Sequence, residues 1–330
     1  MKTKKIKKFN KVDYTSWVWP MKLHPSSFYC QPFVNPVVSI NSGQMFLWEQ
    51  IGNSWYGIYG NHIIKFSTSS KNKSFFIDNN KNNEIQFYSY PEAKGWERKV
   101  FRLDDDIKTI LSTLSNDALV SKTIRKYPGL RLMRQEPYQC IFSFVCASNT
   151  NILRIRKMLK NISKKFGCKV IFDGQEFYTF PSAHSLNKAT INELISCGVG
   201  YRAKTIQAVA KHIVSGNLDI DYLIRIKYHY AKEELLKVYG IGNKIADCIL
   251  LFSLEKLDSF PIDVWILRAL SRYYSWLFPE IENKFKMIDK ITTSQYNVLS
   301  DSIRNYFGKY SGYAQQYIFY YMREVAGKKW

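Results

Sequence analysis

The sequence has few of the residue patterns on which metal centres and disulfide frameworks are built. Its six cysteines contain no CxxC pair, and its five histidines form no HxxxH or HExxH pattern. Zinc sites and iron–sulfur clusters need such closely spaced ligands, so we expect no metal and no metal cofactor. Scattered cysteines in a chain of 330 residues do not imply disulfides, and they favour a reduced, intracellular protein.

Long apolar segments are also missing from the sequence. No run approaches the roughly 18 apolar residues that a membrane-spanning helix needs. The N-terminal segment MKTKKIKKFNK is basic and has no apolar stretch behind it, so we expect a solvated arm and not a secretory signal. The sequence therefore predicts a protein with no membrane partner.

Acidic residues are scarce relative to basic ones. The chain has 27 Asp and Glu against 48 Lys and Arg, which gives a net charge of +21 at pH 7. Cationic side chains that neutralise phosphates release counterions, so this excess is typical of a nucleic-acid-binding protein. A generally basic surface would give the same count. Hydrophobic residues make up 46% of the chain, which indicates a globular protein.

The N-terminal third has the patterns of β-strands. Within residues 30–103, SWYGIYGNHIIKFS alternates aromatic and β-branched residues on both sides of a Gly-Asn turn, which is typical of a hairpin. The segment Lys71–Asn83 is polar, and we expect a loop or a hairpin tip there. These patterns predict an antiparallel sheet.

From about Asp105 onward, apolar residues recur at helical spacing in nearly every segment. The fold class we expect is therefore α+β. The predicted domains are a β-rich N-terminal domain with its basic arm at residues 1–120, and an all-helical domain at residues 121–330.

The segment LLKVYGIGNKIADCILLF predicts two helices joined by a very short turn. The first helix is expected to end at Tyr239, and Gly240, Ile241 and Gly242 form the turn. Glycine adopts backbone conformations that a β-carbon forbids, and the second helix begins with free N–H groups that can bind a phosphate. A GxG turn alone is weak evidence, but between two amphipathic helices it indicates a helix–hairpin–helix that clamps the DNA backbone.

Lys244 lies in the first turn of the second helix of this hairpin, and Asp263 follows nineteen residues later in FPIDVWILRAL. Taken alone, Lys244 predicts a phosphate contact or a solvated charge, and Asp263 predicts an ordinary helix N-cap. Taken together they suggest chemistry on a sugar. An amine can attack a sugar carbon and form a Schiff base, while a carboxylate stabilises the positive charge that develops there.

GIGNKIADC followed by PIDVW resembles the helix–hairpin–helix (HhH-GPD) DNA glycosylase superfamily, and within it the 8-oxoguanine DNA glycosylase/AP lyases. Four further motifs occur in the order of that family, and the resemblance extends from about residue 30 to residue 325. It implies an N-terminal antiparallel sheet domain of the TBP-like type followed by an all-α glycosylase domain. The four motifs are NSGQMFLW (41–48), ASNTNILRI (147–155), GVGYRAKTI (198–206) and SGYAQQYIF (311–319).

The resemblance implies a role for each matching residue around the damaged base. Lys244 and Asp263 would be the catalytic pair, and Gly240 and Gly242 would contact a phosphate. Four residues would recognise the base: Gly43 through its carbonyl at N7–H, Cys248 through a thiolate dipole favoured by Lys244, Gln315 at the Watson–Crick edge and Phe319 by stacking.

Four other residues would act on the opposite strand once the base leaves the stack. Asn149 would fill the vacated space and Tyr201 would wedge into the duplex, while Arg154 and Arg202 would bind the unpaired cytosine. Each has an ordinary alternative: a helix cap, a core aromatic, or solvated charges. Gly43 as a bulge glycine and Cys248 as a buried structural cysteine are alternatives of the same kind.

Three positions depart from the family pattern. Trp265 stands where eukaryotic members carry a histidine near the phosphate, Leu47 stands at a usual arginine, and Thr150 interrupts a run of asparagines. These differences bear on phosphate contacts and on the opposite-base preference.

The resemblance as a whole implies an intracellular, monomeric enzyme that excises 8-oxoguanine from double-stranded DNA and nicks the abasic site without a cofactor. The alternatives are a glycosylase of the same fold for other damaged bases, such as alkylated purines, and a non-catalytic helix–hairpin–helix DNA-binding protein.

Overall fold

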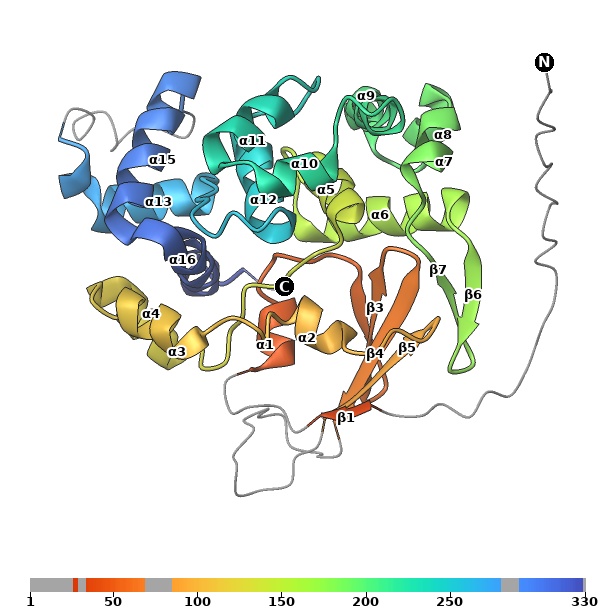
Figure 1. The fold of residues 1–330 in the computed structure, drawn as a ribbon, viewed down its shortest axis with the longest axis horizontal. Coiled ribbons are helices and arrows are strands. Elements are labelled where there is room, and N and C mark those ends of the chain that lie inside the picture. Colours follow the sequence, from red (N-terminus) through yellow and green to blue (C-terminus); the bar gives the residue numbers. More distant parts are fainter. Residues whose placement is uncertain (1–25, 29–33, 69–84, 280–290, 329–330) are drawn as a thin grey trace, which may run out of the picture.

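The computed structural model describes residues 26–28, 34–68, 85–279 and 291–328 (Figure 1). The predicted basic arm and the polar segment Lys71–Asn83 lie outside these residues. In the part of the chain that is described, no helix is long and apolar enough to cross a membrane.

The predicted antiparallel sheet is confirmed. Its five strands run in the order β1-β5-β4-β3-β2, and all neighbours are antiparallel. The β3–β4 hairpin pairs Tyr59 with His62 around the predicted Gly60-Asn61 turn, and Gly60 has a φ of 59°. The strands are β1 (Ser26–Phe28), β2 (Trp48–Ile51), β3 (Ser54–Tyr59), β4 (His62–Thr68) and β5 (Ile85–Tyr90).

The expectation that residues 30–103 form only strands is wrong for two short helices, α1 (Pro36–Ile40) and α2 (Trp96–Val100). Helix α1 begins at a proline, and the Asn35 side chain accepts a hydrogen bond from the Val38 N–H at 3.0 Å. Both features are standard helix-start signals, and the β-branched residues that follow obscured them.

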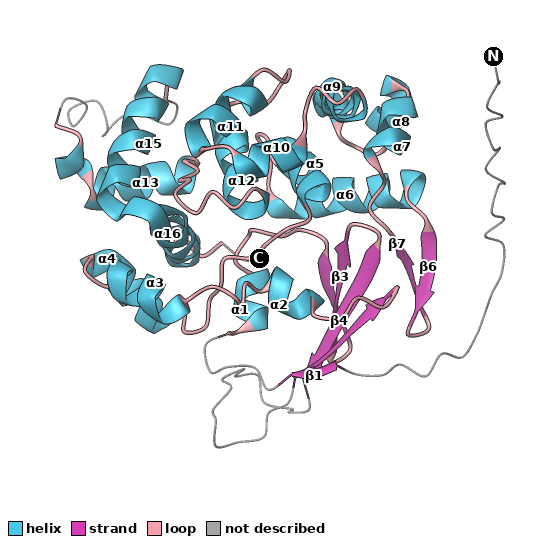
Figure 2. Ribbon diagram, viewed as in Figure 1, coloured by secondary structure: helices cyan, strands magenta, loops and turns pink. Residues whose placement is uncertain are grey.

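Helices gather on one side of the sheet and form the larger part of the molecule (Figure 2). Among them are α5 (Pro137–Cys146), α6 (Ile152–Phe166), α9 (Ala203–Val214), α11 (Tyr228–Leu236), α12 (Asn243–Ser253), α13 (Val264–Tyr273), α15 (Thr293–Phe307) and α16 (Ser311–Val325). The others are α3 (Ile107–Leu114), α4 (Ala118–Lys126), α7 (Ala183–Lys188), α8 (Ile191–Ser196) and α10 (Ile220–Arg225).

A second hairpin, β6 (Lys169–Phe172) and β7 (Gln175–Tyr178), interrupts the region predicted as entirely helical. Asp173 and Gly174 form its turn with φ values of 56° and 71°. Asp-Gly is a strong hairpin signal, which the helical periodicity just before it concealed. The hairpin packs on the main sheet, where Phe177 stacks on Tyr56 with ring centroids 5.2 Å apart.

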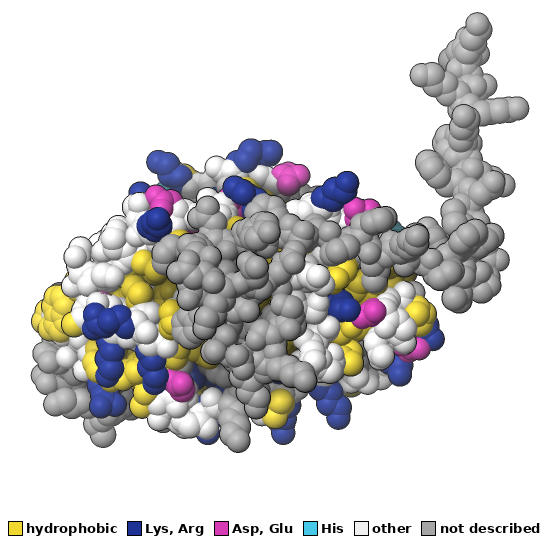
Figure 3. All heavy atoms as spheres, turned by 90° about the horizontal axis from the view of Figure 1, so that it is seen from below, with side chains coloured by type: hydrophobic (Ala, Val, Ile, Leu, Met, Phe, Trp, Pro, Cys, Tyr) yellow, Lys and Arg dark blue, Asp and Glu magenta, His cyan; other side chains and the backbone are white. Residues whose placement is uncertain are grey.

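The largest apolar core crosses the predicted domain boundary at residue 120. It joins Phe46 and Ile110 from the N-terminal part to residues of the helical part such as Phe142 and Leu250. The boundary itself stays a prediction. On the face seen in Figure 3, more lysine and arginine side chains than acidic ones are visible among the residues that are not grey.

A cluster of charged side chains fastens the N-terminal part to the end of α12. Arg102, with 0% of its surface exposed, donates two hydrogen bonds to the Glu255 carboxylate at 2.8 and 3.1 Å. Arg134 donates to the same carboxylate at 2.9 Å and also binds Asp104 at 3.1 Å. Two planar guanidinium groups on one carboxylate fix the orientation of the segment that follows α12.

We predict that Glu255→Ala lowers the free energy of unfolding by about 2–3 kcal/mol, because it leaves the buried Arg102 without its main partner. Burial alone would raise the pKa of Glu255, but the charges of Arg102 and Arg134 hold it below its usual range. The carboxylate therefore stabilises the fold at neutral pH, and this contribution is lost as the pH falls through the lowered pKa.

Urea unfolding at pH 7 measures the effect, with Glu234→Ala as the matched control. Glu234 pairs with Lys237 at the surface, at 2.6 Å, and its loss should cost less than about 1 kcal/mol. Equal losses for the two variants would contradict a structural role for the cluster.

Candidate active site

The predicted helix–hairpin–helix is formed by α11 and α12. The first helix ends at Leu236, earlier than the predicted Tyr239, and residues 237–242 make the connection. Gly240 has a φ of 82°, and a β-carbon there would lie 2.0 Å from Thr205 Oγ1. Gly242 caps α12 at φ −97° and ψ 176°, which any residue adopts. The expected need for glycine is therefore confirmed at Gly240 and wrong at Gly242.

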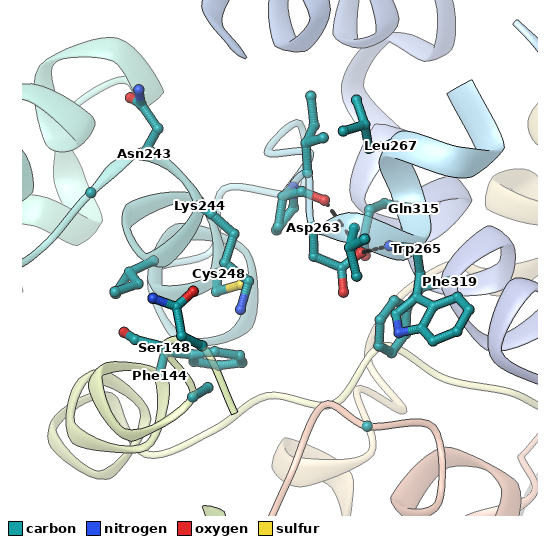
Figure 4. Close-up of a pocket in the computed structure, with 18 of the residues that line it drawn as sticks. Phe144, Ser148, Asn243, Lys244, Cys248, Asp263, Trp265, Leu267, Gln315 and Phe319 are labelled. Carbon is teal, nitrogen blue, oxygen red and sulfur yellow. Dashed lines mark hydrogen bonds between the residues drawn. The ribbon is translucent and has the colours of Figure 1, made fainter. Parts of the chain in front are cut away.

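One cavity of about 610 Å³ brings together most of the residues predicted to act on the base (Figure 4). It is lined by residues from the α1–β2 loop, α5, the α5–α6 loop, α6, α12, the segment before α13, α13, α15 and α16. The predicted residues in its wall are Gly43, Asn149, Gly242, Lys244, Cys248, Asp263, Gln315 and Phe319.

Lys244 is the second residue of α12, and its half-buried side chain extends along the cavity wall beside Cys248 (Figure 4). Its Nζ atom lies 5.4 Å from the centre of the Phe144 ring, close enough for a cation–π contact. The helix that carries Lys244 thus presents the amine to the cavity from its first turn.

Cys248 lies on the same face of α12 as Lys244, as the i,i+4 spacing predicts. Its side chain is buried, and burial raises its pKa to about 12, although the charge of Lys244 acts in the opposite direction. The thiol is therefore neutral at physiological pH, and the expectation of a thiolate is wrong. Desolvation outweighs the ammonium because the sulfur has almost no contact with solvent.

Asp263 is the helix N-cap that the sequence offered as one alternative, and it also lies beside the cavity, as the other alternative requires. Its Oδ1 atom accepts hydrogen bonds from the N–H groups of Trp265 and Ile266, each at 2.9 Å, so it is the N-cap of α13. The same side chain lines the cavity (Figure 4). Burial raises the pKa of Asp263, while these two hydrogen bonds and the charge of Lys244 favour the ionised form.

Gln315 presents an unused acceptor in the cavity wall. Its Nε2 atom donates to the Pro261 carbonyl at 3.1 Å, which orients the amide, and its buried Oε1 atom has no protein partner. Phe319 lies one helical turn later on α16 and is half-buried. Gly43 has a φ of 79°, where a residue with a side chain would be strained. An acceptor, an aromatic face and an accessible backbone thus border one cavity.

The residues predicted to act on the opposite strand differ in their exposure to solvent. Asn149, Arg154 and Tyr201 are exposed, with 65% of the Tyr201 surface open to solvent. Arg202 is only 8% exposed, and its guanidinium donates to the Ser148 carbonyl, at 3.1 Å from Nε. In this structure Arg202 therefore braces the loop that carries Asn149, and its contact with cytosine stays a prediction.

Several other residues in the cavity wall were not predicted from the sequence. Phe144 and Tyr296 belong to no motif, and Arg323 follows the last quoted motif.

Trp265, the first departure from the family pattern, also lines the cavity, and the Arg268 guanidinium lies 4.9 Å from the centre of its ring. Leu47, the second departure from the family pattern, is a buried core residue. Among the described residues, no group of three or more His, Cys, Asp or Glu could hold a metal ion.

The two hairpin glycines allow a matched test. Gly240→Ala should lower the free energy of unfolding by at least about 2 kcal/mol, because alanine is strained at this φ and its β-carbon meets Thr205. Gly242→Ala should leave thermal stability unchanged, since its backbone is ordinary and nothing lies within 4 Å of the added atom. Melting curves of both variants decide the point, and equal destabilisation would refute the distinction.

Comparisons with known proteins agree with this geometry. Residues 34–141 match the 8-oxoguanine DNA glycosylase N-terminal domain, and residues 142–288 match the HhH-GPD superfamily of base excision DNA repair proteins. The chain is 33% identical over 195 residues to a probable N-glycosylase/DNA lyase of Methanothermobacter thermautotrophicus, covering 53% of this chain and 62% of that protein. It is 28% identical to the N-glycosylase/DNA lyase of Saccharomyces cerevisiae, covering 88% and 86% of the two chains.

A solved structure gives the same result in three dimensions. The Clostridium acetobutylicum 8-oxoguanine glycosylase/lyase, in complex with double-stranded DNA containing cytosine opposite 8-oxoguanine, superposes with a TM-score of 0.72. It is 29% identical, and the match covers 86% of this chain and 90% of that one. The two family matches, the shared fold and the cavity that holds Lys244 and Asp263 lead to one conclusion: the chain belongs to the 8-oxoguanine DNA glycosylase family of the HhH-GPD superfamily.

Proposed function

We propose that this protein removes 8-oxoguanine from double-stranded DNA and then cleaves the strand at the abasic site. The observation that carries the proposal is the convergence of Lys244 and Asp263 on one cavity from the N-terminal ends of two helices. The cavity also holds an aromatic face and hydrogen-bonding groups suited to a single base, which must leave the duplex to enter it.

The covalent steps follow from the two side chains. Once its ammonium has given up a proton, the Lys244 amine forms a bond to C1′ of the sugar while the bond from C1′ to the base breaks. The base departs with the electron pair of that bond and takes up a proton. Asp263 stabilises the positive charge that the sugar carries in the transition state. Opening of the sugar ring then gives an imine between Lys244 and C1′.

The imine makes strand cleavage possible at the same site. It acidifies the hydrogen on C2′, and loss of that proton expels the 3′ phosphate in a β-elimination. Hydrolysis of the remaining imine releases the Lys244 amine unchanged. Each bond is made and broken by an amine, a carboxylate and water, so these steps involve no cofactor.

The cavity wall supports recognition of an oxidised guanine. The free Oε1 atom of Gln315 is an acceptor, which fits the N–H donors on the Watson–Crick edge of guanine. Oxidation places a hydrogen on N7, and the Gly43 carbonyl would accept it. Phe319 would stack on the base, and Cys248 would act as a neutral thiol with a weak S–H dipole.

Exposed residues near the cavity support recognition of the opposite strand. Asn149, with a φ of 46°, would fill the vacated space, and the exposed Tyr201 would wedge into the duplex. Arg154 and Arg202 would hydrogen-bond the orphaned cytosine, and the Arg202 guanidinium would first exchange its bonds to the Ser148 carbonyl.

Gly240 and Gly242 would place the first turn of α12 against a phosphate. We expect the protein to bind as a monomer.

We predict that borohydride traps a covalent complex between the protein and a duplex with 8-oxoguanine opposite cytosine, and that Lys244→Gln abolishes it. Borohydride reduces only the imine, so trapping reports the Schiff base directly. Undiminished trapping by Lys244→Gln would place the nucleophile elsewhere. Trapping on an alkylated purine but not on 8-oxoguanine would favour the same-fold alternative. Absence of any adduct would favour a non-catalytic binding protein.

We predict that Asp263→Asn slows base release by about 100-fold or more, while thermal stability is unchanged or slightly higher. A carboxylate that stabilises a developing cation acts in the transition state, so its loss appears in the rate. Asparagine caps a helix nearly as well as aspartate. Because burial raises the pKa of Asp263, its ionised form costs stability above that pKa, and the neutral amide avoids this cost.

Single-turnover kinetics and a melting curve on the same Asp263→Asn preparation separate the two roles. A parental rate of base release would show that Asp263 is only a helix cap. Asp219→Asn is the matched control, since Asp219 caps α10, away from the cavity, by accepting from the Tyr222 N–H at 3.0 Å. That variant should keep both rate and stability.

A further inference from the structure

A buried polar network lies behind the active-site cavity and centres on Asp247, which has no exposed surface. Both carboxylate oxygens of Asp247 are fully used. Oδ1 accepts from the hydroxyls of Tyr228 at 2.6 Å and Ser259 at 3.2 Å. Oδ2 accepts from the Tyr296 hydroxyl at 2.7 Å and from Lys232 Nζ at 3.0 Å. The network therefore joins α11, α12, α15 and the segment that leads to α13.

An apolar core would fill this space at no loss of stability. Burying an ion pair such as Lys232 and Asp247 removes both charges from water, and well-packed hydrophobic residues are often as stabilising or more so. What a fully satisfied polar network adds is a single permitted arrangement of the elements that it connects. This network therefore holds α11, α12, α15 and the segment that leads to α13 in one arrangement.

Tyr296 is the member of the network that reaches the catalytic segment. Its hydroxyl donates to Asp247 and accepts from the Ile262 N–H at 3.1 Å, directly before Asp263 in the chain. Burial, followed by the charge of Asp247, raises the pKa of Tyr296 well above its ordinary value, so the phenol keeps its proton. The ring also lines the cavity. Tyr296 therefore connects the buried network to the wall of the active site.

The other end of this connection leads to the nucleophile. Asp247 lies three residues after Lys244 on α12, almost one helical turn away. A continuous chain of short contacts thus runs from the helix of Lys244 through the Asp247 carboxylate and the Tyr296 hydroxyl to the backbone beside Asp263. Two further hydrogen bonds hold the segment before α13. The Ser259 hydroxyl, which belongs to the segment, donates to the Asp247 carbonyl, and Gln315 Nε2 donates to the Pro261 carbonyl.

We propose that Tyr296 is a positioning residue for catalysis: through Asp247 and the Ile262 N–H, its hydroxyl sets the placement of Asp263 relative to Lys244. This inference rests on the proposed function, in which those two side chains act on the same sugar carbon. Without the hydroxyl, the Ile262 N–H has no partner in a buried site, and the segment before α13 shifts to satisfy it. A shift of about 1 Å in a catalytic group can cost about 100-fold in rate.

The chain offers a matched pair of variants for the test. Tyr296→Phe and Tyr228→Phe each remove one hydroxyl from the same buried carboxylate, but among these two only Tyr296 bonds the Ile262 N–H. Tyr296→Phe should slow single-turnover release of 8-oxoguanine by about 10-fold or more. Tyr228→Phe should stay within about 2-fold of the parent, although both variants lower the melting temperature.

A double-mutant cycle shows whether the effect passes through Asp263. If it does, Tyr296→Phe slows base release in the parent but adds little in the Asp263→Asn background. Equal slowing in both backgrounds, or equal slowing by Tyr228→Phe and Tyr296→Phe, would overturn the positioning role. A parental protein that neither releases 8-oxoguanine nor forms the borohydride adduct would overturn the proposed function instead, so the two failures are distinct.

Discussion

The active site depends on one constraint: α12 is buried along almost its whole length, yet its first turn must reach the cavity. Every residue from Ile245 to Ser253 is buried. The helix packs against α5, where Phe144 and Phe252 stack with ring centroids 5.3 Å apart, and against α11. Only the turn that carries Lys244 remains partly open. The position of the amine is therefore set by the packing of a whole helix, and a rotation of α12 would expose apolar surface.

Hydrogen-bonded charges hold this helix at two places, one buried in its middle and one at the exposed Glu255 just after its end. The Asp247 carboxylate is balanced by Lys232 and three hydroxyl groups inside the core. After the helix ends, Glu255 has a left-handed conformation with a φ of 60° and is held by Arg102 and Arg134. The bonds of Asp247 therefore orient the helix about its axis, and those of Glu255 fix where the chain continues toward Asp263.

The geometry of Asp263 makes its position as a helix cap compatible with the catalytic role proposed for its carboxylate. A carboxylate in a buried cavity tends to take up a proton, because desolvation penalises its charge. The N–H groups of Trp265 and Ile266 oppose this tendency by donating to one of its oxygens. The other oxygen has no contact with these N–H groups. The cap thus helps to keep an anion available in a cavity that would otherwise neutralise it.

Local patterns were sufficient to predict α6, α9, α12 and α13, the β3–β4 hairpin and the glycine turn, because each depends on residues close together in the sequence. The family motifs also predicted which residues share the cavity. The polar network could not be predicted, since aspartate and lysine are ordinarily surface residues and nothing in the sequence shows that these two meet a pair of tyrosines where α11, α12 and α15 come together. The neutral state of Cys248 was missed for the same reason: spacing identified the neighbouring ammonium but not the depth of burial.

The base recognition proposed for Gly43 requires the N-terminal part to be held rigidly against the helices. Gly43 comes from the loop between α1 and β2, whereas the other predicted base contacts come from α12 and α16. Hydrogen bonds hold the residues on either side of Gly43 in place, namely Ser42 and Gln44. The Ser42 carbonyl accepts from Gln316 Nε2 at 2.9 Å, and the Gln44 side chain bonds the Arg131 carbonyl and the Met133 N–H at 2.8 and 2.7 Å.

These buried hydrogen bonds leave the Gly43 peptide little freedom to move away from the cavity. The family's discriminating feature is a single hydrogen on N7, and a backbone carbonyl can detect it only if its position is maintained to a few tenths of an ångström. Gln316 and Gln315 are adjacent on α16, so the same helix that orients the free amide oxygen also anchors the loop of Gly43. In the proposed recognition, the contacts to the two edges of the base are therefore coupled through one helix, although the two linked segments are more than 270 positions apart in the chain.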